Sequence, residues 1–335
     1  MRFVIVGVGA VGGVLGSHLS QGWEEVVLVE QKEHIETIRK NGLHLKGRFG
    51  DVVVHPPVAR HINEVTPRDD DVICQAVKQY DTAAAVGQIR EVYKAETPFL
   101  CFQNTMANEE IVSKYFTNVY GVAIRMGAKF VTPGEVHHLG ANTLTMGRYP
   151  SGTDATIEEI ASHVRKGGFE VHVHPNIMGV KWYKLFINLG NSVHSIFGLS
   201  SDESPHNPEC RQIQADLLEE SLNVIKAAGI IPENIHGEPT IEEMITRNRR
   251  HDPPTRPIPA NPEDRAYPSM WQDIYWKRGT TEARELNGRI SALGKRVGLP
   301  TPINDLLTKL VDDMAEKREA PGKYTIAQFK EMLKG

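Results

Sequence analysis

The segment KWYKLFINLGNSV, residues 181–193, combines two lysines and two asparagines with a series of apolar residues. If this segment forms a helix, the apolar residues recur at steps of three and four and lie on one stripe. Lys184, Asn188, Asn191 and Ser195 then fall on a second stripe. A solvated face of an amphipathic helix is one interpretation, although such a face more often carries Glu, Lys and Arg. The alternative is a functional face with one ammonium group among neutral hydrogen-bonding groups.

A glycine pattern near the N-terminus indicates a second kind of chemistry. The apolar run 3–8 leads into Gly7-x-Gly9-x-x-Gly12, and a helix-like stretch follows to Ser20. In a dinucleotide site the first glycine allows a tight turn, the second lets the backbone approach a pyrophosphate, and the third lets the helix pack on the strand. The helix N-terminus favours the negative charge. The predicted cofactor-binding residues of this turn are Gly7, Val8, Gly9, Ala10, Val11 and Gly12.

An acidic residue bears on which dinucleotide is used. Glu30 ends a second β-branched run, residues 26–29. A carboxylate at this point accepts hydrogen bonds from the ribose hydroxyls and would repel the extra phosphate of NADP. Gln31 and Lys32 follow and bring one cation near, but the position that faces the ribose is acidic. The sequence therefore favours NAD(H).

Strand-like and helix-like segments alternate through the first half of the chain. Buried-strand runs are expected at 69–78, 97–104, 118–131, 143–148 and 169–174, with a helix at 154–166. This alternation predicts a doubly wound parallel sheet, in which ligands bind at the carboxyl ends of the strands. Lys78 and Asn104 each follow a strand. They are either ordinary turn residues or, with the glycine turn, the outline of one crevice.

After Pro175 the pattern becomes helical. Helices are expected at 177–198, 208–228, 240–250, 263–278, 281–297, 303–315 and 325–333. The predicted fold is therefore α/β, with a Rossmann-like dinucleotide-binding domain at 1–175 and an all-α substrate and dimerisation domain at 176–335. The segment 246–270 contains six prolines, which exclude a helix through its middle, and Arg247, Arg249, Arg250 and Arg256 make it locally basic. It is either a stiff surface loop or a lid that attracts an anionic substrate.

The composition is that of an ordinary globular protein. Of 335 residues, 40% are hydrophobic and 24% are charged, and the net charge of −4 argues against a nucleic-acid partner. The three cysteines are far apart and form no CxxC pair, which fits a reducing cytoplasm. The apolar run 3–8 is too short for a membrane span. The histidines have no metal-ligand spacing, so no metal is expected.

Several of these features occur together, and in the same order, in a known family. They are VGVGAVGG, Lys78 after a strand, QN at 103–104, the WYKLFINLGN helix and SMWQDI…TTEARELNG at 269–288. The chain resembles the ketopantoate reductase (2-dehydropantoate 2-reductase) family over almost its whole length. The resemblance implies a C-terminal domain like that of 6-phosphogluconate dehydrogenase, a 2-oxo acid substrate, NADP(H) as a possible cofactor and a homodimer.

The resemblance also implies roles for individual residues. Lys184 matches the general acid, which protonates the carbonyl oxygen as hydride reaches the carbon. Burial lowers the pKa of a lysine toward working pH, and its ammonium group stabilises a developing alkoxide. Asn188 matches a substrate-holding residue, and Ser269 a contact to the substrate carboxylate. The residues that match cofactor contacts are Lys78, Asn104, Ala128 and Glu282, the last also meeting the lysine neighbourhood.

Some positions depart from the family pattern. The second asparagine of the usual Asn-x-x-x-Asn is displaced, so that either Asn191 or Ser192 is the partner of Asn188. Thr105 stands where the family usually has Gly, and Glu30 where it usually has a basic residue. The leading hypothesis is NAD(P)H-dependent reduction of ketopantoate to pantoate. Glu30 and the asparagine spacing favour the alternative, a D-2-hydroxy acid dehydrogenase acting on branched or aromatic 2-oxo acids. A nucleotide sensor without catalysis is a third hypothesis.

Overall fold

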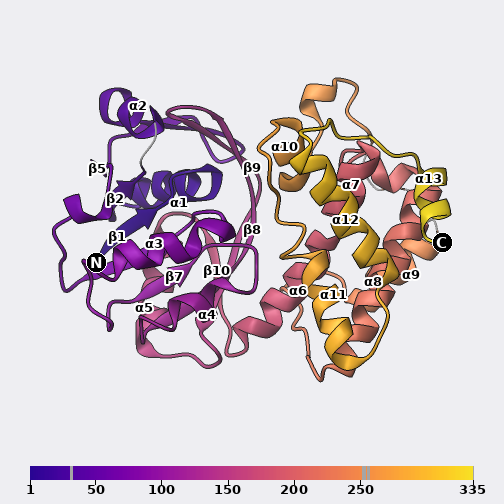
Figure 1. The fold of residues 1–335 in the computed structure, drawn as a ribbon. Coiled ribbons are helices and arrows are strands. Elements are labelled where there is room, and N and C mark those ends of the chain that lie inside the picture. Colours follow the sequence, from indigo (N-terminus) through magenta and orange to yellow (C-terminus); the bar gives the residue numbers. More distant parts are fainter. Residues whose placement is uncertain (31–32, 251–253, 255–256, 335) are drawn as a thin grey trace. The chain divides into compact units, whose positions relative to one another are not determined.

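The computed structural model describes residues 1–30, 33–250, 254 and 257–334. The chain divides into two compact units, residues 1–181 and 182–335 (Figure 1). Within the described residues, no helix combines the length and the apolar character needed to cross a bilayer.

The first unit is built on one sheet. Its strands lie in the order β4-β3-β9-β8-β7-β6-β1-β2-β5, and β10 pairs with β9. Their bounds are β1 (Arg2–Val6), β2 (Glu25–Val29), β3 (Leu43–Gly47), β4 (Val52–Val54), β5 (Val58–Ala59), β6 (Asp71–Gln75), β7 (Phe99–Cys101), β8 (Val119–Thr132), β9 (Glu135–Arg148) and β10 (Glu170–Val173). The strands from β8 to β5 along this order pair in parallel. The carboxyl ends of β1, β2, β6 and β7 therefore share one edge.

The sheet is mixed, whereas the sequence predicted a parallel one. Strands β8 and β9 form a long antiparallel hairpin, and β3 and β4 also pair antiparallel. Only Pro133 and Gly134 separate β8 from β9, and Gly134 has φ +83°. Proline followed by a glycine at positive φ suits a tight turn, and a connection this short joins antiparallel strands only. The prediction missed the first part of β9, because only 143–148 reads as a buried run.

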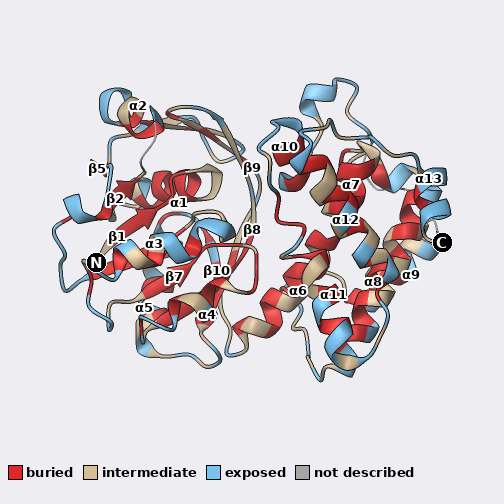
Figure 2. Cartoon of the chain, in the orientation of Figure 1, coloured by how far each residue is buried: buried red, intermediate tan, exposed pale blue. Residues whose placement is uncertain are grey.

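Helices cover both faces of this sheet. They are α1 (Ala10–Gln21), α2 (Glu33–Asn41), α3 (Thr82–Ile89), α4 (Asn108–Val112) and α5 (Ala155–Lys166), with short 3₁₀ turns η1 (Ile62–Glu64) and η2 (Gln79–Asp81). Phe3 and Ile5 belong to one apolar cluster, and Val4 and Val6 to another, so β1 is buried on both faces. Most of α1 is buried as well, as the red ribbon in Figure 2 shows. Burial on both faces is typical of doubly wound parallel strands.

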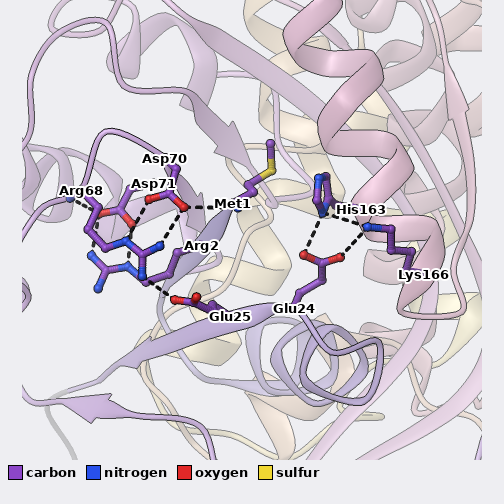
Figure 3. Close-up of polar contacts among 9 residues, drawn as sticks. All are labelled: Met1, Arg2, Glu24, Glu25, Arg68, Asp70, Asp71, His163 and Lys166. Carbon is purple, nitrogen blue, oxygen red and sulfur yellow. Dashed lines mark hydrogen bonds and ion pairs between the residues drawn. The ribbon is translucent and has the colours of Figure 1, made fainter.

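Charged side chains pair at the amino ends of the parallel strands (Figure 3). The Arg2 guanidinium donates to both carboxylate oxygens of the buried Asp71, at 2.6 and 2.8 Å. Arg68 contacts both Glu25 and Asp70. A second group joins the segment after α1 to α5 through Glu24, His163 and Lys166. These contacts tie β1, β2 and β6 together at the edge opposite the glycine turn.

The second unit is helical. Helix α6 (Ile177–Leu189) enters it from the first unit, and α7 (Asn191–Phe197), α8 (Pro208–Ala227), α9 (Ile241–Arg250), α10 (Ser269–Tyr275), α11 (Asn287–Val297), α12 (Pro302–Glu316) and α13 (Ile326–Met332) follow, with 3₁₀ turns η3 (Ser204–His206) and η4 (Pro262–Asp264). The helix expected at 177–198 is divided at Gly190. The helix expected at 263–278 begins only at Ser269, because Pro268 is extended, with ψ 156°. The helix expected at 281–297 begins at Asn287, after a turn.

The proline–arginine segment is only partly described. Its first residues, 246–250, complete α9, and Arg265 pairs with Glu203 at 2.7 Å. Pro253 and Arg256 lie outside the described residues. The choice between a surface loop and a lid therefore stays a prediction.

Candidate active site

The glycine-rich turn joins β1 to α1 and has the shape that a pyrophosphate requires. Gly7 has φ +93°, and a Cβ there would lie 2.7 Å from the backbone nitrogen of Val77. A Cβ at Gly12 would lie 2.0 Å from the carbonyl oxygen of Gly7, so only glycine lets α1 start this close to the strand. A Cβ at Gly9 would meet no atom within 4 Å. The turn is therefore closed at Gly7 and Gly12 and open at Gly9, where a diphosphate approaches the backbone in such sites.

Glu30 reaches this turn from the end of β2. The backbone N–H of Val8 donates to Glu30 Oε2 at 3.2 Å. The carboxylate thus lies beside the open turn, as expected for a group that receives ribose hydroxyls. Gln31 and Lys32, the neighbours that supply a cation in the sequence, lie outside the described residues.

The difference between Gly9 and Gly12 gives a direct test of the turn. Gly9→Ala is expected to keep the fold, with a stability loss of about 1 kcal/mol or less for the helix start. It is expected to raise the Kd for NADH at least about tenfold, since the methyl occupies the space of a closely bound ligand. Fluorescence titration measures this Kd, and thermal unfolding measures the stability.

Gly12→Ala is the matched control for Gly9→Ala. Its Cβ meets backbone, so it is expected to lower the melting temperature sharply. Unchanged NADH binding by Gly9→Ala would contradict a pyrophosphate site at the turn.

Lys78 and Asn104 lie beyond the carboxyl ends of β6 and β7. Strand β6 ends at Gln75 and β7 at Cys101, and these two residues are partners in the parallel register. Both side chains are half-buried. The structure thus brings Lys78, Asn104 and the glycine turn to one edge of the sheet. Ala128, also half-buried, lies on the part of β8 that extends past its pairing with β7.

In the second unit, α6 carries Lys184 and Asn188, and both are buried, with 9% of each residue exposed. The sequence left open whether these side chains form a solvated face of the helix. Their burial argues against that interpretation. The same helix is held by the Tyr183 hydroxyl, which donates to the carbonyl of Pro239 at 2.5 Å.

The two alternatives for the partner of Asn188 lie in different surroundings. Asn191, the first residue of α7, is half-buried. Ser192 is fully buried, and its hydroxyl donates to Oδ1 of Asn287 at 2.5 Å. The sulfur of Met270 lies 3.3 Å from the same hydroxyl. The Ser192 side chain is thus already engaged inside the helical unit.

Ser269 and Glu282 lie at different places in the region of α10 and α11. Ser269 is exposed and is the first residue of α10. Glu282 is buried, in the turn that precedes Asn287, and its carbonyl accepts from the N–H groups of Glu285 and Leu286. The sequence placed both residues in one motif, and the structure separates them by an exposed segment that includes Trp276.

The helical unit also contains a buried network of polar side chains that was not predicted from the sequence. The Asn287 amide donates to the carbonyl of Leu189 at 3.4 Å and to Oδ1 of Asn304 at 3.1 Å. Asn304 in turn donates to Glu220 Oε1 at 2.8 Å. Burial raises the pKa of the Glu220 carboxyl, and hydrogen bonds from Asn304 and Ile303 oppose this effect. The helices that carry Glu220, Asn287 and Asn304 contain several other charged residues, so residue type alone does not single out these three.

Lys181, the other lysine of the opening segment, also has a partner that was not predicted. It forms an ion pair with Glu109 of α4 inside the first unit, and both side chains are buried, at 1% and 0% exposure. A buried pair of this kind is costly to break from one side only.

A backbone open to a diphosphate and a carboxylate beside it are what a dinucleotide-dependent oxidoreductase requires, and the chain is of that class. More specifically, it belongs to the ketopantoate reductase family. The family model described as Ketopantoate reductase PanE/ApbA matches residues 3–151, and its C-terminal counterpart matches residues 176–315.

Individual relatives agree with this family. The 2-dehydropantoate 2-reductase of Pyrococcus horikoshii is 28% identical over 93% of this chain and 96% of its own. A ketopantoate reductase structure from Ralstonia eutropha JMP134 has a TM-score of 0.80 at 25% identity, over 95% of this chain and 99% of its own. D-mandelate dehydrogenase in complex with NADH and anilino(oxo)acetate has a TM-score of 0.79 at 25% identity, with the same coverage.

Proposed function

We propose that the chain reduces 2-dehydropantoate to pantoate with a nicotinamide dinucleotide. The observation that carries the proposal is the combination of the open turn at Gly9 with a buried lysine at the family's general-acid position, Lys184. The name of the Pyrococcus horikoshii relative supports the same reaction.

The proposed roles cover hydride supply, proton donation and substrate binding. A dinucleotide held with its diphosphate at the glycine turn would supply the hydride from its nicotinamide ring. The ammonium group of Lys184 stabilises the negative charge on the carbonyl oxygen and donates a proton to it. Asn188 orients the substrate, and Ser269 binds its carboxylate. Lys78, Asn104, Ala128 and Glu282 are proposed as cofactor contacts.

Of the two partners for Asn188, we favour Asn191. The hydroxyl of Ser192 would have to leave Asn287 before it could bind a substrate, and Asn287 would lose a buried hydrogen bond. Asn191 is half-buried, and its backbone carbonyl, rather than its side chain, accepts from Ser195 at 2.9 Å.

The proposed cofactor is NAD(H), because the Glu30 carboxylate lies beside the turn. Glu30→Gln keeps the size and an acceptor oxygen for Val8 but removes the charge. It is expected to lower the ratio of kcat/KM for NADH over NADPH at least about tenfold, since a like-charge contact costs several kcal/mol. Initial rates with both cofactors measure the ratio. An unchanged ratio, or a preference of the unmodified enzyme for NADPH, would overturn the assignment.

Initial rates of NADH and NADPH oxidation test the substrate, with ketopantoate beside a panel of branched and aromatic 2-oxo acids. Fastest turnover of ketopantoate would support the proposal. Turnover of the bulkier acids alone would favour a D-2-hydroxy acid dehydrogenase, the function that the similarity to D-mandelate dehydrogenase supports. Nucleotide binding without turnover of any acid would favour a sensor.

The proposal includes a homodimer, as the family resemblance implies. Sedimentation velocity of the purified chain measures its mass against the 37.3 kDa of one copy. A single species at that mass would refute this part.

A further inference from the structure

Thr82 begins helix α3, four residues after Lys78, and is fully buried. Its hydroxyl accepts from Nε2 of Gln103 at 3.0 Å and donates to Oδ1 of Asn108 at 2.8 Å. Its carbonyl accepts from Nε2 of Gln75 at 3.3 Å. One threonine therefore binds three side chains that come from the ends of β6 and β7 and the start of α4.

These contacts extend to a fifth residue. The Asn108 amide donates to the hydroxyl of Thr105 at 2.8 Å and contacts its carbonyl at 3.3 Å. We call Gln75, Thr82, Gln103, Thr105 and Asn108 the Thr82 cluster. All five residues are buried. Helices α3 and α4, which carry two of its members, contact each other.

The cluster has a fixed hydrogen-bond direction. A threonine hydroxyl holds one proton, and here Asn108 Oδ1 receives it. Gln103 must then present its NH₂ group to the hydroxyl, and Asn108 must present its own NH₂ group to Thr105. Loss of the Thr82 hydroxyl would leave a donor on Gln103 and an acceptor on Asn108 without this partner in a buried place, which is costly.

The cluster spans the two loops that carry the candidate cofactor contacts. Gln75 and Thr82 bracket the loop with Lys78, and Gln103 and Thr105 are the immediate neighbours of Asn104. Thr105 stands where the family usually has glycine. Its hydroxyl accepts the last hydrogen bond in the series that runs from Gln103 through Thr82 and Asn108. This departure from the family pattern therefore adds a hydrogen bond beside Asn104.

We propose that Thr82 is a positioning residue for the dinucleotide site, which sets the spacing between the loop of Lys78 and the loop of Asn104. The inference rests on the proposed function, which assigns these two residues to the cofactor. Thr82 itself touches neither cofactor nor substrate in this role.

Two substitutions at Thr82 separate the hydroxyl from the shape of the side chain. Thr82→Val keeps the volume and removes the hydroxyl, and Thr82→Ser keeps the hydroxyl and removes the methyl. Thr82→Val is expected to raise the Kd for NADH about tenfold, the effect of two unpaired buried groups, and Thr82→Ser to stay within about twofold. Fluorescence titration measures the Kd, and circular dichroism checks the fold.

A kinetic readout distinguishes positioning from mere loss of folded protein. Thr82→Val is expected to raise the KM for NADH while kcat at saturating NADH stays within about twofold, whereas a smaller folded fraction would lower kcat and leave KM unchanged. If Thr82→Val does not fold, Thr105→Val serves in its place. It removes the hydroxyl that accepts from Asn108 and is expected to raise the Kd for NADH about threefold.

Each remaining outcome overturns a definite claim. A folded Thr82→Val that binds NADH like the unmodified chain, or a Thr82→Ser as weak as Thr82→Val, would overturn the positioning role alone. Absence of NADH binding by the unmodified chain would overturn the proposed function and this inference with it.

Discussion

Replacement of Lys184 by alanine is expected to lower kcat with the best 2-oxo acid at least about 100-fold, the contribution of a positioned general acid. The side chain is buried on α6, in a stripe that otherwise offers neutral polar groups. Without it, the ammonium group proposed to balance the charge that develops on the carbonyl oxygen is lost. The Kd for NADH is expected to change little, because the glycine turn and Glu30 belong to the first unit.

Two further variants sharpen this test. Lys184→Arg keeps a positive charge but cannot give up its proton at working pH. A kcat above that of Lys184→Ala would show that the charge contributes to the rate. A kcat as low as that of Lys184→Ala would assign the loss to proton donation. Lys226→Ala removes an exposed lysine of α8 that pairs with Glu242, and it is expected to leave kcat unchanged. Turnover by Lys184→Ala within tenfold of the unmodified enzyme would refute the mechanism.

The dinucleotide-binding half was predictable because its signals are local. The glycine spacing, the strand before it and Glu30 lie within 30 residues of the chain start. The β8–β9 hairpin was missed although its turn signal, Pro133-Gly134, is visible, because the outer part of β9 is too polar to read as a buried strand. In the helical unit, periodicity found the helices but placed the starts of α10 and α11 too early.

The partners of the candidate residues could not be predicted from spacing. Glu109 and Lys181 are 72 positions apart, and Ser192 and Asn287 are 95 apart. Residue type alone indicated that Ser192 could bind a substrate as well as Asn191. Only the fold shows that the Ser192 hydroxyl is already bound to Asn287.

Lys181→Met is expected to lower the free energy of unfolding by about 3–5 kcal/mol, the cost of leaving one member of a buried ion pair alone. The methionine fills the space of the lysine stem, so packing changes little. The loss comes from Glu109, whose buried carboxylate would lose the ammonium group of Lys181. Urea unfolding followed by circular dichroism measures the change. The dependence of the unfolding free energy on urea concentration is compared between the variants.

The double variant Glu109→Gln/Lys181→Met isolates the pair. Because it leaves no unbalanced charge, it is expected to recover more than half of the stability that Lys181→Met loses. A double variant as unstable as Lys181→Met would show that the loss arises from packing rather than charge.

The two lysines of α6 are three residues apart, and both are buried, yet they are expected to behave in opposite ways. Lys181→Met should lose stability and keep kcat per folded molecule, because its partner Glu109 belongs to the scaffold of the first unit. Lys184→Ala should lose kcat and keep most of its stability. A lysine between Tyr183 and Leu185 is then explained by chemistry, and a lysine before Trp182 by an ion pair. If both variants lost the same property, burial on this helix would not distinguish a catalytic lysine from a structural one.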